Sequence, residues 1–432
     1  MGNKSWKWLV LASILAGALC AAGSQAGEEK TQPRTFNSAV AFDVYAEGNG
    51  GHEVGSTPSK QPLTIPPCHW WWVIPLSPVD MEKVRQEVQA QGIPGLELRR
   101  ASDAMLEHLK GLTELQYLVL IHTQVTDTGL EHLKGLTGLQ ALFLTGTKVT
   151  DAGLEHLKGL VALQQLYLAD TQVTDAGLVD LKGLMALRRL DLSGTQTTDV
   201  GLEHLKGLTG LQYLRLAGAK VIGAGLEHLK GLTGLQYLDL YHTQVTDTGL
   251  EHLKGLTALQ LLTLRGTQVT GPGLQHLKGL MALQGLDLQG TQVTDAGLEH
   301  LKGLMALRWL DLQGTQVTGA GLEHLKGLTA LQRLDLSQTQ VTDAGLEHLK
   351  GLAGLQDLNL LGTRVTDAGL EHLEGLTALQ YLDLSGTKVT DAGLVHLKGL
   401  AGLHYLYLIQ TQVTDAGVEQ LKKSLPNVEV RR

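Results

Sequence analysis

Residues 367–390, DAGLEHLEGLTALQYLDLSGTKVT, decide the fold, because the same 24-residue pattern recurs along most of the 432-residue chain. Thirteen such units follow one another from Asp103 to Thr414 without a break in phase. A fixed period of about 20 to 50 residues is typical of solenoids, in which each repeat is one small unit that stacks on the next. The sequence therefore predicts a single elongated stack rather than several globular domains.

Each unit combines two periodicities. Leucines alternate over 379–384, which favours a short strand with one buried face, whereas they recur every third residue over 370–376, which favours a short helix. We expect Thr366 to cap the start of this helix and Gly375 to end it in a left-handed conformation. We also expect Thr387, which follows the strand, to hydrogen-bond loop backbone groups between units.

Stacking places strand beside strand in a parallel sheet and helix beside helix. Strands lie about 4.8 Å apart whereas helices need about 10 Å, so the stack must curve. The predicted fold class is therefore α/β. It is a curved horseshoe with a parallel β-sheet on its concave face and short helices on its convex face.

The consensus LxxLxLxxTxVTDAGLxxLxxL resembles the leucine-rich-repeat family. It is similar to the ribonuclease-inhibitor-like and cysteine-containing types of repeat, and to the repeats of bacterial envelope proteins. The resemblance covers about three quarters of the chain and implies a leucine-rich-repeat solenoid that recognises a macromolecule on its concave face. It implies no particular ligand, because function lies in the sites that a fold carries.

The N-terminus has the features of a secretory signal at residues 1–26. Lys4 and Lys7 precede an apolar run over 8–20, and small residues follow it. The run is short for a membrane span, so we expect no span after signal removal, with retention as an anchor as the alternative. We therefore predict a secreted, periplasmic or cell-envelope protein, in which Cys68 is the single cysteine left after removal.

The flanks of the repeats differ from the units. Residues 27–60 are polar and contain several glycines, and we interpret them as a disordered linker. Residues 61–102 contain three tryptophans, Trp70 to Trp72, and a helical pattern, which predict an N-terminal cap; a docking or membrane-surface segment is the alternative. Residues 415–432 continue the leucine phase and are predicted to form a C-terminal capping repeat.

Aromatic residues inside the repeats fall at positions that the strand alternation directs to the concave face. Exposed tyrosine and tryptophan on a rigid sheet are common anchors of recognition surfaces, although aromatic residues also favour strands for other reasons. We predict partner binding by ten of them: Tyr117, Phe143, Tyr167, Tyr213, Tyr237, Tyr241, Trp309, Tyr381, Tyr405 and Tyr407.

The expected function is non-enzymatic binding of a protein or peptide. Aspartates such as Asp287, Asp311 and Asp335 outnumber arginines on the concave face, which favours a basic partner. A structural or adhesive envelope protein that binds polysaccharide is the alternative. A net charge of −8 without a basic block disfavours nucleic acid. The chain has no nucleophile elbow, phosphate loop or HExxH motif, so we predict no catalytic residue and no cofactor.

Histidine recurs on the predicted convex helices. Neighbouring imidazoles could share a transition metal, but no fixed set of ligands accompanies them, so no metal site is predicted. Protonation below about pH 6 would make this face positive. The column comprises His108, His132, His156, His204, His228, His252, His276, His300, His324, His348, His372 and His396.

One unit departs from the pattern at residues 217–225. Ala219 replaces the threonine after the strand, Ile222 replaces the capping threonine, and Gly223 replaces the aspartate. Loss of a helix cap costs about 1 kcal/mol, so we expect this coil to be softer than its neighbours.

Overall fold

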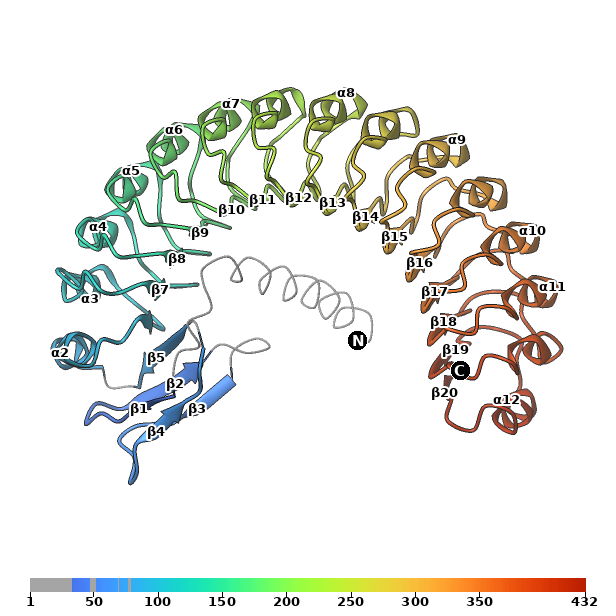
Figure 1. The fold of residues 1–432 in the computed structure, drawn as a ribbon, viewed down its shortest axis with the longest axis horizontal. Helices are drawn as coiled ribbons and strands as arrows, with labels where there is room; N and C mark the ends of the chain where they lie inside the picture. The colour runs from blue at the N-terminus through green and yellow to red at the C-terminus, as the bar shows by residue number, and fades with distance from the viewer. Residues whose placement is uncertain (1–32, 47–51, 69, 77–78) are drawn as a thin grey trace.

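A computed structural model describes residues 33–46, 52–68, 70–76 and 79–432 of the chain. These residues form a horseshoe with one sheet along its inner wall and short helices along its outer rim (Figure 1). The predicted curved α/β architecture is confirmed. The proposed signal at residues 1–26 lies outside the described residues.

One long sheet runs through the molecule. It begins with β3 (His52–Ser56), β2 (Phe42–Ala46) and β5 (Trp71–Pro75), each antiparallel to its neighbour. From β5 onward the pairings are parallel. The strands that follow are β6 (Gly95–Glu97), β7 (Tyr117–Val119), β8 (Ala141–Phe143), β9 (Gln165–Tyr167), β10 (Arg189–Asp191), β11 (Tyr213–Arg215), β12 (Tyr237–Asp239), β13 (Leu261–Thr263), β14 (Gly285–Asp287), β15 (Trp309–Asp311), β16 (Arg333–Asp335), β17 (Asp357–Asn359), β18 (Tyr381–Asp383), β19 (Tyr405–Tyr407) and β20 (Glu429–Arg431).

The repeat length fixes the register of the sheet. Along the repeats, each strand residue pairs with the residue 24 positions further on, as Tyr213 does with Tyr237 and Leu214 with Leu238. The middle leucine of each strand is buried in the solenoid interior, and Leu214 and Leu238 are both 0% exposed. Because side chains alternate along a strand, the first and third residues of each strand line the concave wall.

Short helices form the outer rim, usually as one α-helical turn followed by a 3-10 turn. The α-helices are α2 (Met81–Gln91), α3 (Asp103–Glu107), α4 (Asp127–Glu131), α5 (Asp151–Leu154), α6 (Asp175–Leu178), α7 (Asp199–Leu202), α8 (Asp247–Leu250), α9 (Asp295–Leu298), α10 (Asp343–Leu346), α11 (Asp367–Leu370) and α12 (Asp415–Lys422). The 3-10 helices are η1 (Glu155–Leu157), η2 (Val179–Leu181), η3 (Glu203–Leu205), η4 (Ala224–Leu229), η5 (Glu251–Leu253), η6 (Pro272–Leu277), η7 (Glu299–Leu301), η8 (Gly319–Leu325), η9 (Glu347–Leu349), η10 (Glu371–Leu373) and η11 (Gly393–Leu397).

A ladder of aspartates joins one coil to the next. Asp175 accepts hydrogen bonds from the backbone N–H (2.7 Å) and the hydroxyl (2.6 Å) of Thr198 in the following coil. A Cβ on Gly201 would lie 2.3 Å from the Asp175 carboxylate, which explains why glycine recurs two residues after the aspartate. The predicted capping threonine thus also donates hydrogen bonds to the preceding coil. Thr366 donates in this way to Asp343, but its side chain does not cap its own helix.

Glycine interrupts this ladder in three units, at Gly223, Gly271 and Gly319. At Gly319 the coils approach closely, because an added Cβ would lie 2.9 Å from the Cα of Gly345. All three units replace the α-helical turn by 3-10 helix, in η4, η6 and η8. Gly223 has a φ of +127°, and the softness of its coil stays a prediction.

Two details of the predicted unit are wrong. Gly375 does not have a positive φ, and the left-handed residue instead follows the strand, as at Gly386 (φ +68°). Thr387 donates its hydroxyl to the carbonyl of Leu384 (2.6 Å), so this bond lies within one coil rather than between coils. The chain therefore turns through a left-handed residue where it leaves the strand, and the threonine closes that turn.

The structure contradicts the predicted disordered linker over the part of residues 27–60 that it describes, residues 33–46 and 52–60. Besides β2 and β3, β1 (Arg34–Phe36) pairs with β4 (Leu63–Ile65). Phe36, Phe42 and Val44 are buried, and their apolar side chains give this region a core despite its polar composition. The cap therefore begins before residue 61, and the predicted helix is present in it as α2, which ends at Gly92 in a left-handed conformation.

The C-terminal residues complete a last coil. In α12 the hydroxyl of Thr414 accepts from the N–H of Gly417 (3.2 Å), and β20 pairs with β19. No helix in the described ranges has the length and hydropathy that crossing a bilayer requires.

Candidate functional site

Nine of the ten predicted aromatic residues lie in strands of the inner wall, and Tyr241 lies just after β12 (Figure 1). Their positions in the strands turn them toward the concave side. First positions hold Tyr117, Tyr213, Tyr237, Trp309, Tyr381 and Tyr405, and third positions hold Phe143, Tyr167 and Tyr407.

A central patch is formed by Asp191, Tyr213, Arg215, Tyr237 and Asp239. The rings of Tyr213 and Tyr237 stack with centroids 4.2 Å apart and planes 7° apart. Arg215 bridges two coils, because its guanidinium lies 3.1 Å from a carboxylate oxygen of Asp191 and 3.1 Å from one of Asp239. Strand register brings these side chains together, so the patch is ordered by the fold itself.

Burial sets the charge state of the central patch. It raises the pKa of the Tyr213 and Tyr237 hydroxyls, which therefore stay protonated at neutral pH. Burial lowers the pKa of Arg215, but the Asp191 and Asp239 carboxylates outweigh it and keep the pKa above its usual range. The patch thus holds one cation between two carboxylates.

Tyr237 differs from the exposed anchor that the sequence predicted. It is only 8% exposed, because the Tyr213 ring covers one of its faces and its hydroxyl lies 3.4 Å from Asp239. Tyr237 therefore packs against the ring of Tyr213 and exposes little surface of its own.

Arginines flank the central patch and stack on tyrosines. The Cζ of Arg189 lies 5.8 Å from the ring centroid of Tyr213, and that of Arg265 lies 5.2 Å from the centroid of Tyr241. A guanidinium over an aromatic ring is attracted by the negative face of the ring. Arg189 belongs to the same coil as Asp191, whereas Arg265 extends the ordered surface by one coil beyond β12.

Trp309 lies beyond the central patch, beside a glycine of the neighbouring strand. A Cβ on Gly285 would lie 2.9 Å from Cε3 of Trp309 and 2.4 Å from Cδ1 of Leu261. The missing side chain at Gly285 therefore provides the space that these two apolar side chains occupy.

The remaining predicted residues fall into separate groups. Phe143 and Tyr167 stack with centroids 4.6 Å apart, whereas Tyr381 and Tyr407 are tilted at 5.2 Å. Tyr405 is the most open of the ten, at 46% exposure. The structure thus divides the predicted row into an N-terminal stretch, the central patch and a C-terminal group.

Sequence reasoning missed that the aromatic row continues onto the cap. Trp70 stacks on Tyr117 at 4.9 Å, and Trp72 stacks on Tyr45 at 5.5 Å. Trp71, between them, is buried in the core of the cap. Three consecutive tryptophans at the start of a strand were the available signal, because their side chains must alternate between the two faces, and this arrangement supports the cap interpretation of the segment.

The aspartates at third strand positions have a structural role. Asp335 accepts hydrogen bonds from the N–H (2.9 Å) and the hydroxyl of Ser337, which closes the turn after β16. Asn359 accepts similarly from the N–H of Leu361 (3.0 Å), so this turn does not require a negative charge. No group of three or more potential metal-binding side chains occurs in the part of the chain that the structure describes.

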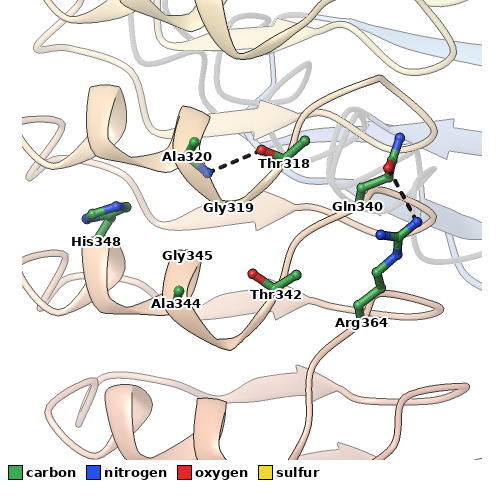
Figure 2. Close-up of a pocket in the computed structure, with 9 residues that line it drawn as sticks. All are labelled: Thr318, Gly319, Ala320, Gln340, Thr342, Ala344, Gly345, His348 and Arg364. Carbon is green, nitrogen blue, oxygen red and sulfur yellow. Dashed lines mark hydrogen bonds between the residues drawn. The ribbon is translucent and has the colours of Figure 1, made fainter.

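An open pocket lies between two coils at the point where Gly319 interrupts the aspartate ladder (Figure 2). On one side the N–H of Ala320 donates to the hydroxyl of Thr318 (3.3 Å), and on the other Arg364 donates to Gln340 (3.3 Å). None of the predicted aromatic residues lines it. The lining residues are Thr318, Gly319, Ala320, Gln340, Thr342, Ala344, Gly345, His348 and Arg364.

Comparison with known proteins finds leucine-rich-repeat proteins among the matches. Residues 327–350 and 375–397 match the family model described as Leucine Rich repeat. An internalin (inlF) of Listeria monocytogenes is 27% identical with a TM-score of 0.63, over 74% of this chain and 88% of that one. A leucine-rich-repeat protein of Leptospira interrogans is 19% identical with a TM-score of 0.60, over 80% and 91%.

A plant structure shares the same fold. The ectodomain of the receptor kinase GASSHO1/SCHENGEN3 of Arabidopsis thaliana is 19% identical with a TM-score of 0.52, over 78% of this chain and 46% of that one. The search of curated proteins gives no match.

The repeated coil, the parallel inner sheet and these likenesses define a solenoid of the class that generally serves as a binding module. The chain is a leucine-rich-repeat protein.

Proposed function

We propose that this chain binds a protein or peptide through its concave wall and catalyses no reaction. The observation that carries the proposal is the central patch, with its stacked Tyr213 and Tyr237 and its bridging Arg215. Tyrosine and arginine are enriched among the residues that dominate binding energy at interfaces. Because these side chains are already held in place, binding would cost little side-chain entropy.

The fold supports this proposal. The plant receptor ectodomain was solved in complex with CASPARIAN STRIP INTEGRITY FACTOR 2, so a solenoid of this kind accommodates a partner. The likeness to that receptor extends to the fold alone. The partner of this chain must therefore be sought from its own surface.

The proposed contact surface comprises the predicted aromatic residues with Arg189 and Arg265 added. Tyr213 is half-buried and is the more accessible ring of the stacked pair, whereas Tyr237 is 8% exposed. A basic partner suits the aspartates of the C-terminal half, such as Asp335, which would attract lysine or arginine side chains.

Selection from a random peptide library displayed on phage tests this proposal. The purified chain serves as bait, and each enriched peptide is afterwards measured against the wild type and against Tyr213→Ala. Met185→Ala is the matched control, because Met185 is 56% exposed and lies outside the strands. We expect enriched peptides to bind the control normally and the Tyr213 variant at least about tenfold more weakly. Equal binding to both variants would contradict the proposal.

A structural or adhesive protein that binds polysaccharide is the second candidate. The stacked pairs that Trp70 and Trp72 form beside the concave wall favour it, because aromatic rings also pack against sugar rings. A glycan array probed with the chain and with Trp70→Ala tests this candidate. Signals that depend on Trp70 and not on Tyr213 would favour polysaccharide over peptide.

We also propose that the protein is secreted or lies in the cell envelope, as the signal-like residues 1–26 indicate. Fractionation of cells that express the full chain, with N-terminal sequencing of the mature product, tests this location.

A further inference from the structure

The histidine column of the convex face is less exposed than a solvated surface would be. In nine of these residues the Nδ1 atom is buried and has no hydrogen-bond partner within the described structure. A buried ring nitrogen is tolerated when the imidazole is neutral, because a second buried N–H would need an acceptor. The nine are His132, His156, His204, His252, His276, His300, His324, His348 and His372.

The repeat places the residue 22 positions earlier, on the preceding coil, opposite a column position, and two ion-pair contacts show this directly. Where an aspartate replaces histidine, Asp180 lies 3.1 Å from Lys158. Where a glutamate replaces lysine, Glu374 lies 2.7 Å from His396. We call these clamped junctions, because opposite charges meet across the coils. At the N-terminal end, Glu82 of α2 provides a similar clamp for His108 at 3.5 Å.

At the other junctions a lysine faces the histidine. Lys230 and His252, for example, line one surface hollow between two coils, together with Glu251 and Lys254. His276 faces Lys254 as well as Glu251 and Asp247 of the preceding coil. Its own neighbour in sequence is the neutral Gln275, whose side-chain nitrogen lies 3.5 Å from Nε2. Glu251 is already paired with Lys254 at 3.2 Å.

The next junction repeats this arrangement. His300 is affected by Lys278 and His276 of the preceding coil and by Glu299 beside it. Burial, with a contribution from Lys278, lowers the pKa of His300, and burial with Lys254 does the same for His276. Each junction of this kind would bring two positive charges together if the histidine were protonated.

We propose that the convex histidine column is an acid-sensitive element, in which the lysine-facing junctions loosen below about pH 6 while the clamped junctions hold. The folded state favours the neutral imidazole at His276 and His300, where burial and the facing lysine both lower the pKa, whereas an unfolded histidine titrates near pH 6.5. As pH falls through that value the unfolded chain binds more protons, so the free energy of unfolding decreases. The histidine column therefore makes the outer rim the first part of the solenoid to weaken in acid.

Urea unfolding of the full chain at pH 7.5, 6.5 and 5.5 tests the proposal. We expect the wild-type midpoint to fall over this range. Lys254→Glu/Lys278→Glu recreates the Glu374–His396 clamp at two junctions, so its midpoint should fall less than that of the wild type. His276→Gln/His300→Gln removes two of the titrating groups and should also reduce the fall.

Lys148→Glu/Lys388→Glu is the matched control, since it makes the same charge change at loop positions after strands. The control should lose as much stability in acid as the wild type. Burial raises the pKa of Asp357 and Asp383, but these groups are common to the wild type, the variants and the control, so the comparison among them isolates the histidine junctions. A wild-type midpoint that is constant or rises toward pH 5.5 would overturn the proposal. So would a clamped variant that loses as much as the control.

Discussion

Replacement of Arg215 by methionine removes the cation that the two carboxylates of the central patch, Asp191 and Asp239, share. The side chains of Asp191 and Asp239 are only 5% and 6% exposed, so water compensates little for the loss. Breaking a buried ion pair on one side costs about 3 to 5 kcal/mol. The Arg215 side chain is itself 32% exposed, which screens part of the interaction, and we expect a loss of about 2 to 4 kcal/mol.

Urea unfolding at pH 7.5 measures this loss, with Asp191→Asn/Arg215→Met/Asp239→Asn as the comparison. The triple variant removes all three charges and should recover most of the stability. Asparagine is suited to this strand position, as Asn359 shows by closing its own turn.

A single variant within about 0.5 kcal/mol of the wild type, or a triple variant as unstable as the single one, would refute the reasoning.

Three further predictions concern glycines. Gly201→Ala should lower the free energy of unfolding in urea by about 1 to 3 kcal/mol, because its methyl group would displace the ladder carboxylate of Asp175. Gly183→Ala has open space around it and should change this free energy by less than about 1 kcal/mol. Equal effects of the two substitutions would argue against the ladder. Gly285→Ala should move Trp309 and alter the tryptophan fluorescence, and a spectrum identical to that of Gly183→Ala would contradict this packing. The coil that contains Gly223 should exchange its amide hydrogens faster than both neighbouring coils, and protection equal to theirs would exclude local softness.

The fold of the repeat was predictable because its leucine pattern is compatible with only one arrangement of strand and helix. The alternation over 379–384 fixes which residues face the core, and the 24-residue period fixes the register, so the concave row follows from counting. The Asp175–Thr198 bonds were not predictable in the same way, since they join residues of different units. The recurring glycine was the one visible trace of this contact.

The N-terminal cap and the burial of individual side chains were not predicted, for a different reason. Composition suggested a linker at residues 27–60, but a few apolar residues such as Phe42 suffice to fold a strand against an existing sheet. The 8% exposure of Tyr237 depends on its neighbour in the next coil, which a reading of single positions does not contain. Burial of the histidine Nδ1 atoms has the same origin.

The most direct test of the central claim is the hydrogen-exchange footprint of a library-selected peptide bound to the chain. The account predicts slowed exchange in β10 to β13 and in the turns that follow them, with little change at the helices of the same coils. Protection confined to the convex helices or to the outer turns would show that the ligand binds elsewhere, and that the stacked tyrosines serve only the fold.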